Sequence, residues 1–156
     1  MILNHQRGIR VSIRKLDEFA AAARNLLKLP DDAVTVCLVS NVEMARWNRA
    51  YRGKKGPTDV LSFPRDGAGL RTKRTNLRNK PRSSADSTEA ASYLGDIAIA
   101  PGVARRNALR FGRTFDQEMR ILILHGMLHL MGYDHETDSG QMDRRERKLR
   151  RALKLE

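Results

Sequence analysis

Hydrophobic and polar residues follow distinct spacings along this chain, and each spacing predicts a strand or a helix. Ile9–Ile13 alternates apolar and polar residues, which is typical of a half-buried strand. Val34–Val39 is an apolar, largely β-branched run and predicts a central strand. Between them, apolar residues recur at helical spacing and predict a helix that ends before Pro30; they are Leu16, Phe19, Ala20, Ala23, Leu26 and Leu27.

The second half of the chain carries clear signals for where helices begin and end. Ser40 and Glu43 have the spacing of a capping box and predict a short helix to about Ala50. Thr114 and Gln117 have the same spacing and predict the start of an apolar helix. The remaining elements are expected as strands at Asp59–Pro64 and Leu94–Ala100, and as helices at Pro101–Phe111 and from about Ser139 to Leu153.

This order of elements predicts an α/β (α+β) fold with a small mixed four-stranded sheet packed with about five helices, in one domain over residues 1–156. The segment 65–92 differs from the rest, because it has almost no large apolar residue and contains seven Lys and Arg against three Asp and Glu. We expect a basic loop that is disordered without a partner. The loop is either an arm that contacts RNA or a simple insertion.

The net charge of the chain indicates what kind of partner it binds. The net charge of +12 over 156 residues favours a polyanionic partner, either nucleic acid or an anionic membrane, over a generally basic protein. No apolar run is long enough to cross a bilayer, and the N-terminus lacks the apolar core of a signal peptide. The single cysteine, Cys37, cannot form an internal disulfide and is expected in the core. A cytoplasmic protein is expected.

Three of the four histidines lie within eleven residues, and they form the strongest candidate site. His125 and His129 are four apart, so a helix places both on one face. Gly132 then suits a left-handed helix end, after which the chain can bring His135 to the same point. A pair of histidines on an apolar helix is often part of a core, but three such rings together favour a metal ion. Three imidazoles and a water make an open tetrahedral site, and we expect one Zn²⁺.

The residue after the first histidine argues against a peptidase. A zinc peptidase helix reads H-E-x-x-H, with the glutamate as general base, and this chain has Gly126 at that position. Asp134, next to the third histidine, is either a base or outer partner of the site or a residue that forms the turn.

Basic residues outside the histidine window are candidates for phosphate contacts. Arg52 could hold a phosphate bidentately if the fold brings it beside the metal, and it is otherwise a solvated arginine. Lys54 and Lys55 follow it in a basic loop. Arg144 and Arg147 belong to a run in the last helix that holds six cations and one anion, which is either a solvated face or a surface that binds RNA.

Several of these motifs together resemble one family. His125-Gly126-x-Leu128-His129-Leu130-x-Gly132-Tyr133-Asp134-His135 resembles the signature of the YbeY family. Thr58–Pro64 is similar to its second motif and Leu94–Ile97 to its third, so the resemblance extends from about Ser40 to the last helix. The segment 65–92 is longer and more basic than the family pattern leads us to expect.

The resemblance implies a metal-dependent endoribonuclease that acts on single-stranded RNA. It implies a role in maturation of the 3′ end of small-subunit ribosomal RNA and in ribosome quality control, with the small ribosomal subunit as partner and without a membrane or DNA partner. The three histidines would hold the ion, with His125 counted as catalytic too, and the family's functional arginine maps onto Arg52.

Three function hypotheses follow from these residues. The first is hydrolysis of RNA phosphodiester bonds, in which zinc polarises a phosphoryl oxygen and Arg52 stabilises the negative charge of the transition state. The second is a non-enzymatic, zinc-containing module that binds RNA or the ribosome, which a fourth protein ligand such as Asp134 would favour. The third is a zinc peptidase, which Gly126 and the positive charge oppose.

Overall fold

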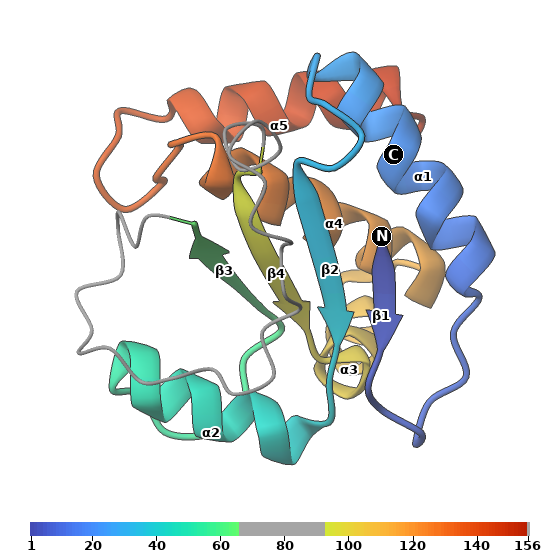
Figure 1. Ribbon diagram of the computed structural model, residues 1–156, viewed down its shortest axis with the longest axis vertical. Helices are drawn as coiled ribbons and strands as arrows, with labels where there is room; N and C mark the ends of the chain where they lie inside the picture. The colour runs from blue at the N-terminus through green and yellow to red at the C-terminus, as the bar shows by residue number, and fades with distance from the viewer. Residues whose placement is uncertain (66–92, 156) are drawn as a thin grey trace.

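A four-stranded mixed sheet forms the centre of the molecule. The computed structural model describes residues 1–65 and 93–155, and the strands lie in the order β1-β2-β4-β3 (Figure 1). β1 (Ile2–Asn4), β2 (Val34–Leu38) and β4 (Gly95–Ile99) are parallel neighbours. β3 (Val60–Pro64) pairs antiparallel with β4. The mixed four-stranded sheet predicted from the sequence is therefore confirmed, while almost all of the segment predicted as a basic loop (66–92 of 65–92) lies outside the described residues.

The strand predicted at Ile9–Ile13 is wrong. The first strand is instead Ile2–Asn4, where Ile2 is buried and pairs with Val36. Residues 5–12 form a loop, because the Gln6 side chain accepts a hydrogen bond from the Ile9 amide and donates one to the Ile9 carbonyl. These bonds hold the backbone in a turn and prevent it from pairing with a strand.

Five helices pack on the sheet, as the sequence predicts. Thr114 and Gln117 form the expected reciprocal capping box, and Ser40 accepts a hydrogen bond from the Glu43 amide. The second helix continues two residues beyond Ala50 and ends where Gly53 adopts a positive φ of 65°. The helices are α1 (Ile13–Leu26), α2 (Asn41–Arg52), α3 (Pro101–Phe111), α4 (Phe115–Leu130) and α5 (Gln141–Ala152). No helix in the described ranges reaches the length and hydropathy that a bilayer span requires.

Alternation along the central strands divides the core between the two faces of the sheet. Val36 and Ile97 belong to the larger cluster, which α1, α4 and α5 cover. Cys37 and Ala98 point to the other face and pack with Met44 of α2. Burial, with Asp96 nearby, raises the pKa of the Cys37 thiol to about 11, so this cysteine is a neutral core residue as expected.

The contact of α4 with β4 is unusually close and fixes where the end of α4 lies. A Cβ built on Gly126 would lie 2.8 Å from Cδ1 and from Cγ2 of Ile97, closer than side chains tolerate. The Ser62 hydroxyl donates a hydrogen bond of 3.3 Å to the Gly126 carbonyl, which joins β3 to the same turn of the helix. Glycine at position 126 therefore lets α4 lie directly on the sheet.

We predict that Gly126→Ala lowers the free energy of unfolding. The added methyl group overpacks the contact with Ile97 at a cost of about 1–3 kcal/mol, and the higher helix propensity of alanine offsets only about 1 kcal/mol of it. Urea unfolding measures the difference. Gly8→Ala is the control, because no atom lies within 4 Å of its Cβ position. A Gly126→Ala variant more stable than the wild type would contradict the packing account.

Candidate metal centre

The last turns of α4 and the segment after it bring three imidazoles together. His125 and His129 lie on one face of the helix, with their Nε2 atoms 3.1 Å apart. The Gly132 backbone adopts a φ of 99°, and the Tyr133 amide donates to the Leu128 carbonyl, so the chain reverses after the helix. This reversal places His135 beside the pair, and one nitrogen from each of the three rings lies within 4.8 Å of the others.

The spacing of these nitrogens fits a single metal ion. Two nitrogens bound to zinc in tetrahedral geometry lie about 3.3 Å apart, since each Zn–N bond measures about 2.0–2.1 Å. The His125–His129 pair already has this separation, and the third ring needs a shift on the order of 1 Å to complete the set. The three predicted ligand residues therefore lie together, and all three donors are imidazole nitrogens, which suit zinc and several other transition metals.

The local electrostatics favour the neutral form of His129. Burial lowers the pKa of His129, and the neighbouring His125 and His135 lower it further. The Asp134 carboxylate and a hydrogen bond with the Tyr133 backbone act in the opposite direction without reversing the shift. Because a metal binds only the neutral ring, the cluster holds its central histidine in the form that coordination requires.

Sequence reasoning missed the acidic partner of this cluster, which is Glu146 on α5. Its Oε1 lies 3.2 Å from Nδ1 of His125, and the residue is only 8% exposed. Burial raises the pKa of Glu146, but the hydrogen bond and charge of His125, together with Arg150, outweigh this effect and lower it. When Nδ1–H of His125 donates a hydrogen bond to this carboxylate, the lone pair of Nε2 is free for a metal.

A signal for Glu146 was present in the sequence. It is the single anion in a run of six cations, and it stands four residues after Met142 and three before Leu149. Both of these apolar residues are buried, so Glu146 lies on the face of α5 that packs on the core.

Asp134, the outer partner suggested by the sequence, occupies a turn. Its Oδ1 accepts a hydrogen bond from the Glu136 amide, and its carbonyl accepts from the amides of Thr137 and Asp138. Within the described residues, the group able to hold a metal consists of the three histidines and does not include Asp134. The turn-forming alternative accounts for its contacts, and its charge acts on the pKa of His129.

The fold does bring Arg52 to the edge of the cluster. Arg52 is the last residue of α2, and its guanidinium lies 3.8 Å from the carboxylate of Glu136, the residue after His135. One third of the Arg52 side chain is exposed. This loose pair at the surface is worth little energy, so the guanidinium can exchange its partner for a phosphate.

The other four basic candidates are exposed and lie in two places, directly after α2 and on α5. Lys54 and Lys55 directly follow the end of α2, and both are exposed. On α5, Arg147 pairs with Asp143, and the Arg144 guanidinium donates to the Ser139 carbonyl. The structure places these four residues on the surface, and their role in binding RNA stays a prediction.

The packing of Gly126 explains why this centre lacks the glutamate of zinc peptidases. Position 126 faces Ile97 of β4, and a glutamate side chain there would meet the sheet. Glu146 of α5 has a different role from that glutamate, because it contacts the ring of the first histidine.

We predict that Glu146→Gln weakens zinc binding by about 10–100-fold, because the amide no longer carries the charge that holds the His125 ring. Competition with a chromogenic chelator measures the affinity. Glu43→Gln is the matched control, since Glu43 pairs with Arg46 on the surface of α2. Equal affinities for wild type and Glu146→Gln would contradict the assigned role, and a larger loss in Asp134→Asn would transfer it to Asp134.

The lowered pKa of Glu146 also predicts a pH dependence in metal-free protein. A depressed folded-state pKa contributes stability that is present above the unfolded pKa of the carboxyl and is lost as pH falls through the folded value. The difference in free energy of unfolding between wild type and Glu146→Gln should therefore shrink from pH 7 to pH 3. Denaturant titrations with a chelator present test this, and a difference that grows in acid would contradict it.

Comparisons with known proteins agree with the resemblance seen in the sequence. A model of the YbeY family, described as endoribonuclease YbeY, matches residues 2–154. A protein of that name from Koribacter versatilis is 38% identical over 99% of this chain and 86% of its own length. Another from Solibacter usitatus is 41% identical over 76% of this chain and 64% of its own length, so the match spans less than two thirds of that relative.

The structure has a similar counterpart as well. The solution structure of a protein from Thermotoga maritima superimposes with a TM-score of 0.55 at 29% identity, covering 98% of this chain and 89% of that one. The match over nearly the whole chain, together with the histidine cluster at the end of α4, establishes that this chain belongs to the YbeY family.

Proposed function

We propose that this chain is a zinc-dependent endoribonuclease that cleaves single-stranded RNA. The observation that carries the proposal is an open cluster of three histidines with Arg52 at its edge. The names of its relatives, endoribonuclease YbeY, support RNA as the substrate. The net charge of +12 supports a polyanionic partner.

Each residue of this centre has a separate proposed role. His125, His129 and His135 would hold the ion, and Glu146 orients the first of these rings. When bound, zinc supplies a Lewis acid that polarises a phosphoryl oxygen. Arg52 would bind the same phosphate and stabilise the negative charge that builds up on it. Its present partner, Glu136, is 64% exposed and gives up the guanidinium at little cost.

The open coordination favours an enzyme over the non-enzymatic, zinc-containing binding factor. A structural zinc site has four protein ligands, whereas the described residues supply three histidines and no carboxylate within the group. The peptidase alternative lacks its general base, because position 126 is glycine.

The finer assignment follows from the family. We propose that the RNA is small-subunit ribosomal RNA, that the reaction belongs to maturation of its 3′ end and to ribosome quality control, and that it occurs in the cytoplasm. Lys54, Lys55, Arg144 and Arg147 are the proposed contacts to the RNA backbone near the site, and the small ribosomal subunit is the proposed partner.

We predict that zinc-loaded wild type cleaves a labelled single-stranded fragment of small-subunit ribosomal RNA and that His129→Ala does not. Arg52→Ala should lower kcat by about 10²–10³-fold, as the loss of one preorganised charge in an active site does. Gel analysis of timed reactions measures the rates. Arg49→Ala, on the same helix and exposed, is the matched control and should retain activity.

Two outcomes would count against the proposal. Equal cleavage by wild type, His129→Ala and Arg52→Ala would identify a contaminating nuclease. Tight binding without cleavage by any of the proteins would favour the non-enzymatic binding factor.

A further inference from the structure

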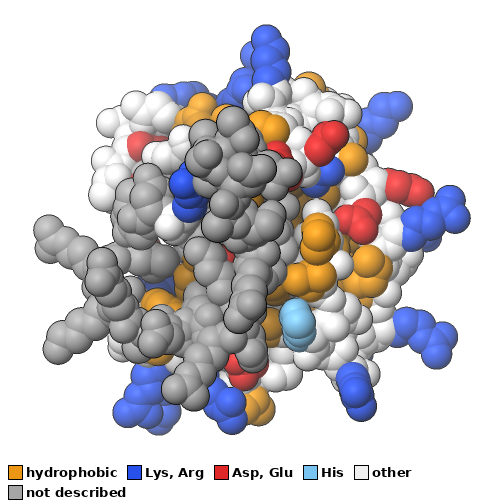
Figure 2. All heavy atoms as spheres, in the orientation of Figure 1, with side chains coloured by type: hydrophobic (Ala, Val, Ile, Leu, Met, Phe, Trp, Pro, Cys, Tyr) orange, Lys and Arg blue, Asp and Glu red, His pale blue; other side chains and the backbone are white. Residues whose placement is uncertain are grey.

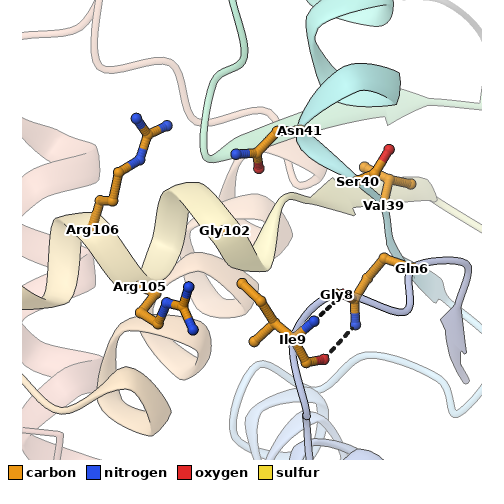
Figure 3. A pocket seen from close by; sticks show the side chains of 9 residues that line it. All are labelled: Gln6, Gly8, Ile9, Val39, Ser40, Asn41, Gly102, Arg105 and Arg106. Carbon is orange, nitrogen blue, oxygen red and sulfur yellow. Dashed lines mark hydrogen bonds between the residues drawn. The ribbon is translucent and has the colours of Figure 1, made fainter.

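A second surface with the features of a phosphate site lies at the other end of the sheet. A cavity of about 390 Å³ opens beyond the carboxyl ends of β2 and β4 (Figure 3). Its walls come from the loop after β1 and from the first turns of α2 and α3, and the side chains and backbone that matter here are Gln6, Ser40, Asn41, Gly102, Arg105 and Arg106.

The charge of this cavity is entirely positive. Its charged lining residues are Arg105 and Arg106, both exposed, and neither forms an ion pair with any described carboxylate. Some other helical arginines do pair within their own helix, as Arg14 does with Glu18 and Arg147 with Asp143. Residues 101–111 of α3 contain no acidic residue that could pair in this way. The two guanidinium groups are therefore available to an anion from outside.

The backbone around the arginines offers further donors. The first amides of a helix have no partner within the helix, and α2 and α3 both begin at this cavity. Ser40 takes up one of the α2 amides, that of Glu43, and leaves the amides of Asn41 and Val42 available. The Gly102 amide belongs to the same group in α3.

A close approach of the Asn41 side chain to the α3 backbone gives the cavity its shape. A Cβ on Gly102 would lie 2.6 Å from Oδ1 and 2.9 Å from Nδ2 of Asn41, so the amide of Asn41 lies over the α3 backbone only because residue 102 is glycine. On the opposite wall, Gln6 is 8% exposed and is held by its two hydrogen bonds with Ile9. Figure 3 shows the two arginines on opposite sides of α3, with Arg106 on the side where Asn41 lies and Arg105 on the side where Ile9 lies.

The cavity is separate from the histidine cluster but linked to it by α2. The cluster lies where α4 crosses the beginning and middle of β4, since Leu130 contacts Gly95 and Gly126 contacts Ile97. Asn41 begins α2 at the cavity, and Arg52 ends it beside the cluster. Twelve helical residues span about 18 Å, a distance that a strand of a few nucleotides covers.

We propose that this cavity binds the backbone of the single-stranded RNA substrate, away from the scissile bond. Arg105 and Arg106 each contact one of two neighbouring phosphates, and the side-chain amide of Asn41 is a further donor. This inference rests on the proposed RNA substrate and extends it to a second contact. A backbone phosphate fits better than a free one, because the arginines are exposed and Arg110 continues the row of positive charge along α3 without a described carboxylate partner.

The test measures binding rather than cleavage. His129→Ala protein with a chelator present is titrated with a fluorescent single-stranded RNA of the small-subunit sequence at several salt concentrations. Adding Arg105→Gln with Arg106→Gln should weaken binding by about fivefold or more and should reduce the slope of log K against log salt by about 1.4, since each phosphate contact to a single strand contributes about 0.7. The matched control is Arg14→Gln with Lys15→Gln, an adjacent exposed pair on α1 that removes the same charge.

A variant that changes no charge separates a shaped cavity from general attraction. Gly102→Ala should displace the Asn41 amide and weaken RNA binding several-fold with the salt slope little changed, and Asn41→Ala should do the same. Circular dichroism checks that each variant is folded. Equal loss in the cavity pair and the α1 pair would overturn the proposal, and so would unchanged binding in the cavity pair. If Gly102→Ala and Asn41→Ala bind RNA as tightly as the parent protein, the attraction comes from surface charge alone and not from a shaped cavity. That result would also overturn the proposal.

Amide shifts distinguish the possible phosphate sources. RNA should perturb the amides of Asn41, Gly102 and Val103, while inorganic phosphate and AMP at the same concentration should perturb them far less. Saturation of these amides by free phosphate or AMP, without preference for RNA, would assign the cavity to a free ligand and overturn the RNA contact. Cleavage is measured separately, so a chain that binds RNA here but cleaves none contradicts the proposed function alone.

Discussion

The close packing of α4 on β4 is the constraint on which the site depends. Because Gly126 has no side chain, the helix lies against Ile97, and the Ser62 hydroxyl of the edge strand β3 donates a hydrogen bond to the same turn. His125 then reaches Glu146 of α5, and both His125 and His129 lie close to His135 in the segment after α4. A larger residue at position 126 would lift this end of the helix and shift both of its imidazoles, those of His125 and His129, away from His135.

The space-filling view in Figure 2 shows the molecule in the orientation of Figure 1, with Lys and Arg side chains projecting around the rim.

The charges that act on the histidine cluster come from nearby acidic residues, although the whole chain is strongly basic. Two acidic groups act on the histidines, Glu146 by a hydrogen bond to His125 and Asp134 by its charge near His129. Arg150 in turn holds Glu146, with 3.4 Å between their charged atoms. This chain of contacts makes α5 part of the centre: its buried face contacts His125, while its outer face carries exposed cations. The same protein therefore combines an open histidine cluster that has acidic neighbours with a positive surface.

Much of the fold and the ligand set could be predicted from local signals. The histidine spacing, the glycine at the helix end and the two capping patterns all act within one helical turn, and they correctly place α4 and the chain reversal that follows it. The prediction of a strand at Ile9–Ile13 was wrong because alternation alone does not reveal whether a neighbouring strand is available. The Gln6 side chain forms hydrogen bonds with the Ile9 backbone instead and holds it in a loop. Glu146 and the α2–α3 cavity depend on contacts between residues far apart in the sequence, which periodicity does not report.

X-ray absorption at the zinc edge of the loaded protein counts the imidazoles that bind the ion, and it therefore tests the three-histidine centre on which the proposed function rests. The account predicts three histidine nitrogens and one further light atom at about 2.0–2.1 Å, with one imidazole fewer in His135→Ala. An unchanged imidazole count in His135→Ala, or two imidazoles in the wild type, would contradict a centre built from His125, His129 and His135.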